Sequence, residues 1–158
     1  MIDKQALRDE LARMIAADLD TRERAHRAAR EGATHEEARP ENDKDTRALE
    51  QSYLARGEAV RVEQLRTALA DVQATPLRAF REGERAALGA VITLEEDGEE
   101  LVIWLAPQGG GSRLADGRVQ VVTPPSPLGR ALLGKVAGDD VTVAVAGRTR
   151  ELSILRVE

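Results

Sequence analysis

The stretch TPPSPLGRALLGKVAGDD, residues 123–140, has the signals of one short helix placed among β-strands. Ser126 is a preferred helix N-cap, and Pro127 suits the first helical position, where its missing N–H costs no hydrogen bond. Gly134 can adopt the left-handed conformation that commonly follows a helix. Three leucines lie within about two turns and are expected to cover the apolar face of a sheet: Leu128, Leu132 and Leu133.

Alternating or short continuous apolar segments surround this helix on both sides, which is the pattern of β-strands. They predict strands at residues 87–96, 100–107, 117–123, 140–147 and 149–158. The pairs Asp97-Gly98 and Ala146-Gly147 stand between consecutive strands and are typical of hairpin turns that need positive φ. Because short connections favour antiparallel pairing, we predict a small antiparallel β-sheet covered by one short helix.

The first half of the chain is rich in Ala, Arg, Glu and Leu, which favours helix. Gly32 and Pro40 interrupt this composition, so we predict two antiparallel helices of about 30 residues each. The apolar positions at helical spacing are Leu7, Leu11, Met14, Ile15, Leu19, Leu49, Tyr53, Val62, Leu65, Leu69 and Val72. The predicted fold class is α+β: a helical coiled-coil hairpin over residues 1–75, with its tip near 31–45, and a sheet domain over 76–158.

The bulk composition excludes several classes of protein. The 158 residues include no cysteine, so disulfide frameworks and thiolate metal sites are excluded. A charged N-terminal segment and the lack of a run of about 18 apolar residues argue against a signal peptide and a membrane partner. We therefore expect a cytoplasmic location. The net charge of -5 argues against nonspecific binding of nucleic acid by the chain as a whole.

The order of these elements and the C-terminal motif resemble the bacterial Gre transcript-cleavage factors. That family has the pattern Ser-Pro-x-x-Arg-x-Leu-x-Gly-Lys, then an acidic pair and a valine-rich strand. The matching residues are Ser126, Pro127, Arg130, Leu132, Gly134, Lys135, Asp139, Asp140, Val141 and Val143. A second match lies in ENDKDTRALEQSYLARG, residues 41–57, through Glu41, Asn42, Glu50, Gln51 and Gly57.

The resemblance implies a factor that binds RNA polymerase through an FKBP-like C-terminal domain and inserts the hairpin into the secondary channel. Such a factor is not an enzyme; it stimulates the polymerase's own cleavage of backtracked transcripts. The implied partners are RNA polymerase and the 3′ end of the nascent RNA, with the chain acting as a monomer. The candidate docking residues are Ser126, Pro127, Arg130 and Lys135.

The acidic tip is the part that the resemblance connects with chemistry. Its carboxylates would be lent to Mg²⁺ in the polymerase, with no cofactor or metal stably bound to this chain alone. The candidates are Glu36, Glu37, Glu41, Asp43 and Asp45. Position 38 is alanine, where the family has an aspartate three residues before the glutamate, so we expect Glu41 to be the main ligand, with Asp43 or Glu37 substituting for that aspartate. Acids at a helix N-terminus also stabilise the helix dipole, which is the alternative interpretation.

Ala38 leaves a second function open, that of a Gre-like or nucleoside-diphosphate-kinase-regulator-like protein that binds polymerase without promoting cleavage. A third class, prolyl isomerases with FKBP-like domains, needs an aromatic-lined pocket. The chain has one Phe, one Tyr and one Trp, which are too few for such a pocket. A coiled-coil adaptor without a polymerase partner is disfavoured by the C-terminal signature.

Four arginines crowd the first helix: Arg22, Arg24, Arg27 and Arg30. One interpretation is contact with RNA phosphates or acidic channel walls, since the Gre family carries a basic patch on its hairpin. The other is a solvated helix face on which Glu23 and its neighbours form i,i+4 ion pairs. His26 and His35 lack a second metal-ligating residue at helical spacing and are expected to be surface residues.

Overall fold

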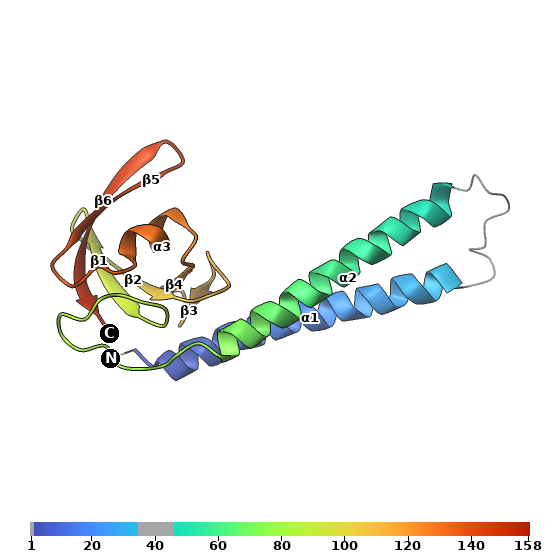
Figure 1. Cartoon of the computed structure of the whole chain (residues 1–158), viewed down its shortest axis with the longest axis horizontal. Helices are drawn as coiled ribbons and strands as arrows, with labels where there is room; N and C mark the ends of the chain where they lie inside the picture. The colour runs from blue at the N-terminus through green and yellow to red at the C-terminus, as the bar shows by residue number, and fades with distance from the viewer. Residues whose placement is uncertain (1, 35–45) are drawn as a thin grey trace. The chain divides into compact units, whose positions relative to one another are not determined.

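The computed structural model describes residues 2–34 and 46–158 (Figure 1). These residues form two compact units. One comprises Met1–Ala12 together with Ala70–Glu158, and the other comprises Arg13–Leu69. The domain boundary at residue 76 stays a prediction, because compactness alone does not test which segment folds independently.

Two long helices confirm the predicted hairpin elements: α1 (Lys4–Thr34) and α2 (Thr46–Gln73). Asp3 begins α1, since its Oδ1 accepts a hydrogen bond of 3.1 Å from the backbone N–H of Ala6. Within the second unit the helices are antiparallel. Arg22 pairs with Glu58 at 3.3 Å, whereas Asp18, one turn earlier on α1, pairs with Arg61 at 3.9 Å, one turn later on α2.

The apolar stripe of the hairpin, that is, the positions at helical spacing named above, is only partly buried in the second unit. Ile15, Val62 and Leu65 are buried in the second unit. Leu49 and Tyr53, however, are 57% and 62% exposed. The physical reason is the composition of the C-terminal half of α1, which offers alanine and arginine and therefore has no large apolar side chains to bury them. Met14, also predicted on the stripe, is 45% exposed.

The sheet domain has six strands in the order β3-β4-β2-β1-β6-β5. Their bounds are β1 Val91–Glu96, β2 Glu99–Leu105, β3 Arg113–Leu114, β4 Val119–Val122, β5 Asp140–Val145 and β6 Arg148–Val157. The predicted antiparallel pairing holds for β1–β2, β1–β6, β3–β4 and β5–β6. Strands β2 and β4 are parallel, which the connection at residues 106–118 is long enough to permit. Strand β3 was not predicted, because two residues carry no periodic pattern.

Both predicted hairpin turns are confirmed by their backbone conformations. Asp97 and Gly98 have φ of 53° and 84° between β1 and β2. Ala146 and Gly147 have φ of 50° and 77° between β5 and β6. Positive φ at both central residues is the conformation that matches the right-handed twist of the flanking strands.

Helix α3 (Pro127–Leu132) packs against β5 and helps to close one face of the sheet (Figure 1). Leu128 and Leu132 are buried in a cluster with residues of β1, β2, β5 and β6. The third leucine does not join them, since Leu133 is 38% exposed. The helix ends at Leu132, and the chain turns at Gly134 with φ of 78°, so Leu133 no longer follows the buried face.

The opposite face of the sheet carries Val91, Trp104 and Val121, all of which are buried. Cover for these residues comes from the helix ends that belong to the same compact unit. Leu7, Leu11 and Val72 are buried there, and the side chain of Leu11 lies against Gly109, where an added Cβ would be only 2.6 Å away. The sheet therefore needs the first turns of α1 and the last turn of α2 to complete its packing.

Polar contacts hold these helix ends to the segment between β2 and β4. The Glu10 carboxylate accepts a hydrogen bond of 3.0 Å from the backbone N–H of Ala115. The Gln108 amide donates to Asp71 at 3.1 Å. Among residues 2–34 and 46–158, no helix combines the length and the apolar character that crossing a membrane requires.

Candidate functional site

The four arginines of α1 fall into two different environments. Arg22 lies 3.6 Å from Asp18 and 3.3 Å from Glu58, and Arg24 lies 2.8 Å from Asp20. Asp18 and Asp20 each precede their arginine by one helical turn, so these pairs follow the i,i+4 pattern of a solvated helix face. The interpretation as structural surface ion pairs fits Arg22 and Arg24.

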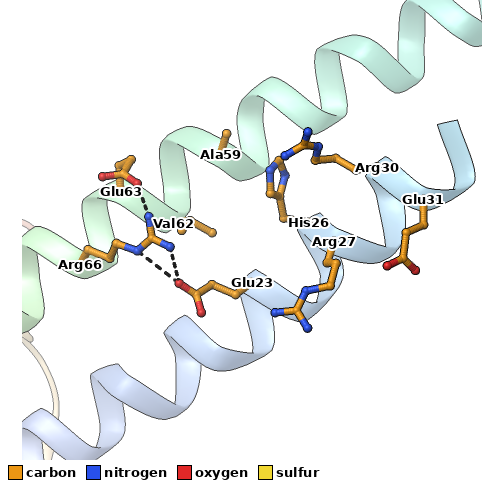
Figure 2. Close-up of a pocket in the computed structure, with 9 residues that line it drawn as sticks. All are labelled: Glu23, His26, Arg27, Arg30, Glu31, Ala59, Val62, Glu63 and Arg66. Atoms are coloured by element: carbon orange, nitrogen blue, oxygen red, sulfur yellow. Dashed lines mark hydrogen bonds and ion pairs between the residues drawn. The ribbon is translucent and has the colours of Figure 1, made fainter. Parts of the chain in front are cut away.

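Arg27 and Arg30 differ, because both are exposed and neither has an ion pair or hydrogen bond within the described part of the chain. The expected i,i+4 partner of Arg27 is Glu23. Figure 2 shows that Glu23 is bound instead by Arg66 of α2. No described carboxylate therefore neutralises either cation, so the interpretation as a contact for RNA phosphates or acidic channel walls fits Arg27 and Arg30.

Arg66 holds two carboxylates at once (Figure 2). Its Nη2 lies 2.6 Å and its Nε 3.2 Å from Oε1 of Glu23, while its Nη1 lies 2.5 Å from Glu63 one turn earlier on α2. These hydrogen bonds, with Glu23 first, raise the pKa of Arg66 above its ordinary value. The guanidinium is charged at any physiological pH, so the bridge does not depend on titration of Arg66.

These residues surround an open groove of about 640 Å³ between α1 and α2. Its lining combines cations and carboxylates with few apolar groups: Glu23, His26, Arg27, Arg30, Glu31, Ala59, Val62, Glu63 and Arg66. This solvent-open groove, lined mainly by charged residues, differs from the enclosed pocket that holds a small-molecule cofactor. It suits an extended, charged ligand that contacts the helix surface.

His26 departs from the expectation of a simple surface histidine. Its side chain is half-buried in this groove, and its Nδ1 is buried without a hydrogen-bond partner among the described residues. Sequence spacing could not show this, because the burial comes from α2. His35 lies outside the described residues.

The tip carboxylates also lie outside the described residues: Glu36, Glu37, Glu41, Asp43 and Asp45. In residues 2–34 and 46–158, no group of three or more His, Asp or Glu side chains is placed to hold a metal ion. The metal-directed role of the tip therefore stays a prediction from the sequence.

The second candidate surface is the turn that leads into α3. Ser126 caps the helix, because its Oγ accepts from the N–H of Gly129 at 3.0 Å and donates to the carbonyl of Thr123 at 2.7 Å. These two hydrogen bonds of the hydroxyl give Ser126 a structural role in the turn. Pro127, by contrast, is exposed on the first turn of the helix.

The two charged docking candidates are Arg130, within α3, and Lys135, just after it, and both are exposed. Arg130 donates a hydrogen bond to the carbonyl of Pro125, which ties its side chain to the proline-rich turn. Lys135 makes no side-chain hydrogen bond or ion pair within the described ranges. The structure thus leaves Lys135 available to a partner.

The contact between Arg66 and Glu23 was not predicted from the sequence. The spacing of three between Glu63 and Arg66 was visible in the sequence. The contact of Arg66 with Glu23 was not, because it depends on the register of α1 against α2. The role of Gly129 was also missed. An added Cβ at Gly129 would lie 2.0 Å from the Thr123 carbonyl oxygen, so the turn requires glycine there.

Comparison with known proteins agrees with the C-terminal motif. The sequence model of the family described as "Transcription elongation factor, GreA/GreB, C-term" matches residues 81–158. The transcription elongation factor GreA of Halorhodospira halophila is 30% identical over 154 residues, covering 97% of this chain and 91% of that protein. The corresponding protein of Alkalilimnicola ehrlichii is 30% identical over 155 residues, with the same shares of the two chains. Among solved structures, the GreA factor homolog 1 (Gfh1) protein of Thermus thermophilus has a TM-score of 0.41 and 18% identity, over 93% of this chain and 94% of that one.

Proposed function

Because this chain belongs to the GreA/GreB family of transcription elongation factors, we propose that it binds RNA polymerase and stimulates the polymerase's own cleavage of backtracked transcripts. The chain would act in the cytoplasm with the polymerase, as a monomer, and it would not be a catalyst itself. Its contributions would be docking, contact with the RNA, and carboxylates supplied by the tip.

The observation that carries the proposal is the pair Arg27 and Arg30, which make no ion pair with the carboxylates of residues 2–34 and 46–158. Both lie in the last turns of α1, on the segment that leads to the tip. They are three residues apart, so they lie on one face of the helix. Guanidinium groups bind phosphate in a bidentate manner, and two on one face would hold the backbone near the 3′ end of an RNA.

Docking would use the surface formed by Pro127, Arg130 and Lys135. Gly129 and Leu128 are buried beneath it, so the α3 turn is held firmly in the sheet domain. A rigid, exposed turn with two cations is suited to an acidic or polar surface of the polymerase. Truncation tests of docking should retain residues 1–12 and 70–158, because Leu7, Leu11 and Val72 are part of the buried core.

The tip would supply oxygen ligands near the polymerase active centre. In that setting Mg²⁺ would stabilise charge on the cleaved phosphate and orient a water molecule. Glu41 is the first candidate by its position in the family pattern, with Asp43 or Glu37 beside it in the sequence. A tip that approaches a metal site through a channel needs polar, acidic residues and no apolar core, which this segment of the sequence fits.

The test is purified RNA polymerase halted in a backtracked complex, with and without this protein, with the shortened transcript measured over time. We expect cleavage to be faster with the native chain, and Glu41→Ala to abolish the stimulation while leaving polymerase binding unchanged. Glu100→Ala, which removes an exposed carboxylate of the sheet domain, is the matched control. Equal stimulation by native chain and Glu41→Ala contradicts the role of Glu41.

A second candidate function rests on Ala38, the position where the family has aspartate. A chain that binds polymerase without completing the metal shell would regulate transcription without cleavage. In the same assay the native chain would then stimulate nothing, and Ala38→Asp would produce stimulation. If Ala38→Asp only increases an activity that the native chain already has, the cleavage factor is the correct assignment.

A further inference from the structure

We propose that Arg66 is a positioning residue for the RNA contact: by holding Glu23 across the hairpin, it keeps Arg27 available to bind a phosphate. This inference rests on the proposed function of Arg27 and Arg30, and it adds a residue on α2 that makes their surface competent. It concerns the second compact unit alone, Arg13–Leu69.

The starting point is a competition for Glu23. On α1, Glu23 precedes Arg27 by four residues, with the glutamate on the N-terminal side, which is the favourable orientation for an intrahelical ion pair. The structure has no such pair. Oε1 of Glu23 instead accepts hydrogen bonds from Nη2 of Arg66 at 2.6 Å and from Nε at 3.2 Å.

The contrast with the neighbouring arginines supports this interpretation. Arg22 and Arg24 each pair with the aspartate one turn before them, at 3.6 Å and 2.8 Å. Arg27 has a carboxylate at the same spacing and yet remains without a partner in the described residues. Asp18 also has a guanidinium of α2 near it, but that of Arg61 is 3.9 Å away. At Glu23 the guanidinium of Arg66 is 2.6 Å away, and this closer contact distinguishes the position (Figure 2).

Glu63 completes the arrangement and prevents the bridge from becoming a new cationic site. Its carboxylate lies 2.5 Å from Nη1 of Arg66, so this guanidinium faces two acids. Arg66 is thereby occupied, and the cations left for an anion in the groove are Arg27 and Arg30. The groove is therefore lined by a cluster whose charges offset one another, Glu23, Glu63 and Arg66, and by the two arginines proposed to bind phosphate.

Loss of Arg66 would act on RNA binding in two ways. Glu23 would become available to Arg27 through an i,i+4 pair. This pair would compete with a phosphate for Arg27 and weaken RNA binding about twofold. The groove would also lose a positive charge at the distance of a few side chains, where screened Coulomb interactions are modest. Together these effects predict RNA binding weakened about three- to fivefold at low ionic strength.

The test is fluorescence anisotropy of a short fluorescein-labelled single-stranded RNA with the full-length chain at low ionic strength. The variants are Arg66→Gln, and Arg66→Gln combined with either Glu23→Gln or Glu63→Gln. The two double variants have the same net charge, and each removes one partner of Arg66. We expect the Glu23 double variant to bind within about twofold of the native chain. The Glu63 double variant should recover only the part due to net charge, and should bind about twofold more weakly than the Glu23 double variant.

A purely structural role of Arg66 predicts a different outcome. Neither double variant restores the bridge between the helices, so the thermal unfolding of the hairpin by far-UV circular dichroism should stay equally lowered in both. Recovery of RNA binding without recovery of stability therefore supports positioning. Equal recovery of binding in the two double variants shows a plain net-charge effect and overturns the inference, as does native affinity in Arg66→Gln.

Two further variants separate this inference from the function on which it rests. Arg27→Gln and Arg30→Gln should each weaken RNA binding and reduce its dependence on salt, by a slope of about 0.7 per lost phosphate contact. If neither changes RNA binding, the RNA surface itself is wrong, and the inference falls with it. If both weaken binding while Arg66→Gln does not, the inference alone is wrong.

Discussion

Replacing Gly129 by alanine should destabilise the sheet domain strongly, although alanine is ordinarily the better helix former. An added Cβ would lie 2.0 Å from the carbonyl oxygen of Thr123 and 2.8 Å from its carbonyl carbon. These are backbone atoms, so no side-chain rotation relieves the clash. The Thr123 carbonyl also accepts hydrogen bonds from Ser126, at 3.0 Å from its N–H and 2.7 Å from its Oγ.

The magnitude follows from what must move. Overpacking of this kind costs about 1–3 kcal/mol. Displacing Thr123 also disturbs the Ser126 cap of α3, and loss of such a cap costs about 1 kcal/mol. We expect the free energy of unfolding to fall by about 2–4 kcal/mol in total, of the same order as a large part of the stability of a small domain.

Urea unfolding followed by tryptophan fluorescence measures this directly, because Trp104 is the single tryptophan and is 0% exposed in the sheet domain. With a denaturant slope of about 2 kcal/mol per molar urea, the midpoint should fall by about 1–2 M. Polymerase binding should weaken as well, because the exposed docking candidates stand on this turn.

Gly110→Ala is the matched control. Its added Cβ also meets Thr123, but at 3.2 Å and against side-chain atoms that can shift. We expect a loss of less than about 1 kcal/mol. If Gly129→Ala unfolds at the same urea concentration as Gly110→Ala or the native chain, the argument from the backbone clash is refuted.

Three other predictions test the hairpin and the sheet. Arg27→Gln should reduce cleavage stimulation in the backtracked-complex assay, whereas Arg24→Gln, which removes a solvated pair with Asp20, should leave it nearly native; equal losses would contradict the distinction between the two arginines. Gly57→Ala should raise the thermal stability of the hairpin by about 1 kcal/mol, since nothing lies within 4 Å of the added Cβ and glycine is unfavourable inside α2; a lowered melting temperature in far-UV circular dichroism would show otherwise. A hydrogen bond from Arg150 lowers the pKa of Glu96 below its ordinary value of 4.5, so this pair stabilises the sheet above pH 4.5, and the stabilisation is lost as the pH falls through the lowered pKa. The difference in unfolding free energy between the native chain and Glu96→Gln should therefore shrink as the pH falls over that range. A difference that stays constant with pH would exclude the ion pair as its source.

Local chemistry made much of the fold predictable. The cap at Ser126, the proline after it and the glycine at 134 act within a few residues of one another, so α3 was predictable without knowledge of its surroundings. The same holds for Asp97-Gly98, whose positive φ is a property of the residues themselves. The exposure of Arg27, Arg30 and Arg130 was predictable for a similar reason, because a charged side chain is solvated without help from a distant part of the chain.

Packing decided what local patterns could not express. Leu133 had the same residue type as its buried neighbours, yet the end of α3 at Leu132 left it exposed. Leu49 and Tyr53 are apolar positions at helical spacing, and both are exposed. Burial requires a large apolar side chain on the opposite helix, and the C-terminal half of α1 offers mainly alanine and arginine. The spacing of apolar residues is a property of one helix, whereas their burial depends on the side chains of the element that packs against it.

The sequence by itself determined the two helices, the strand-rich second half, the capped α3 and the C-terminal motif, because each depends on contacts between residues close in the chain. The tertiary structure alone decided the parallel pairing of β2 with β4, the helix ends that complete the core of the sheet, and the choice of Arg66 by Glu23. The physical reason is register. An ion pair at i,i+4 can be read from one helix, but a carboxylate that lies between two possible guanidinium partners binds the one that the packing of a second helix brings within 2.6 Å.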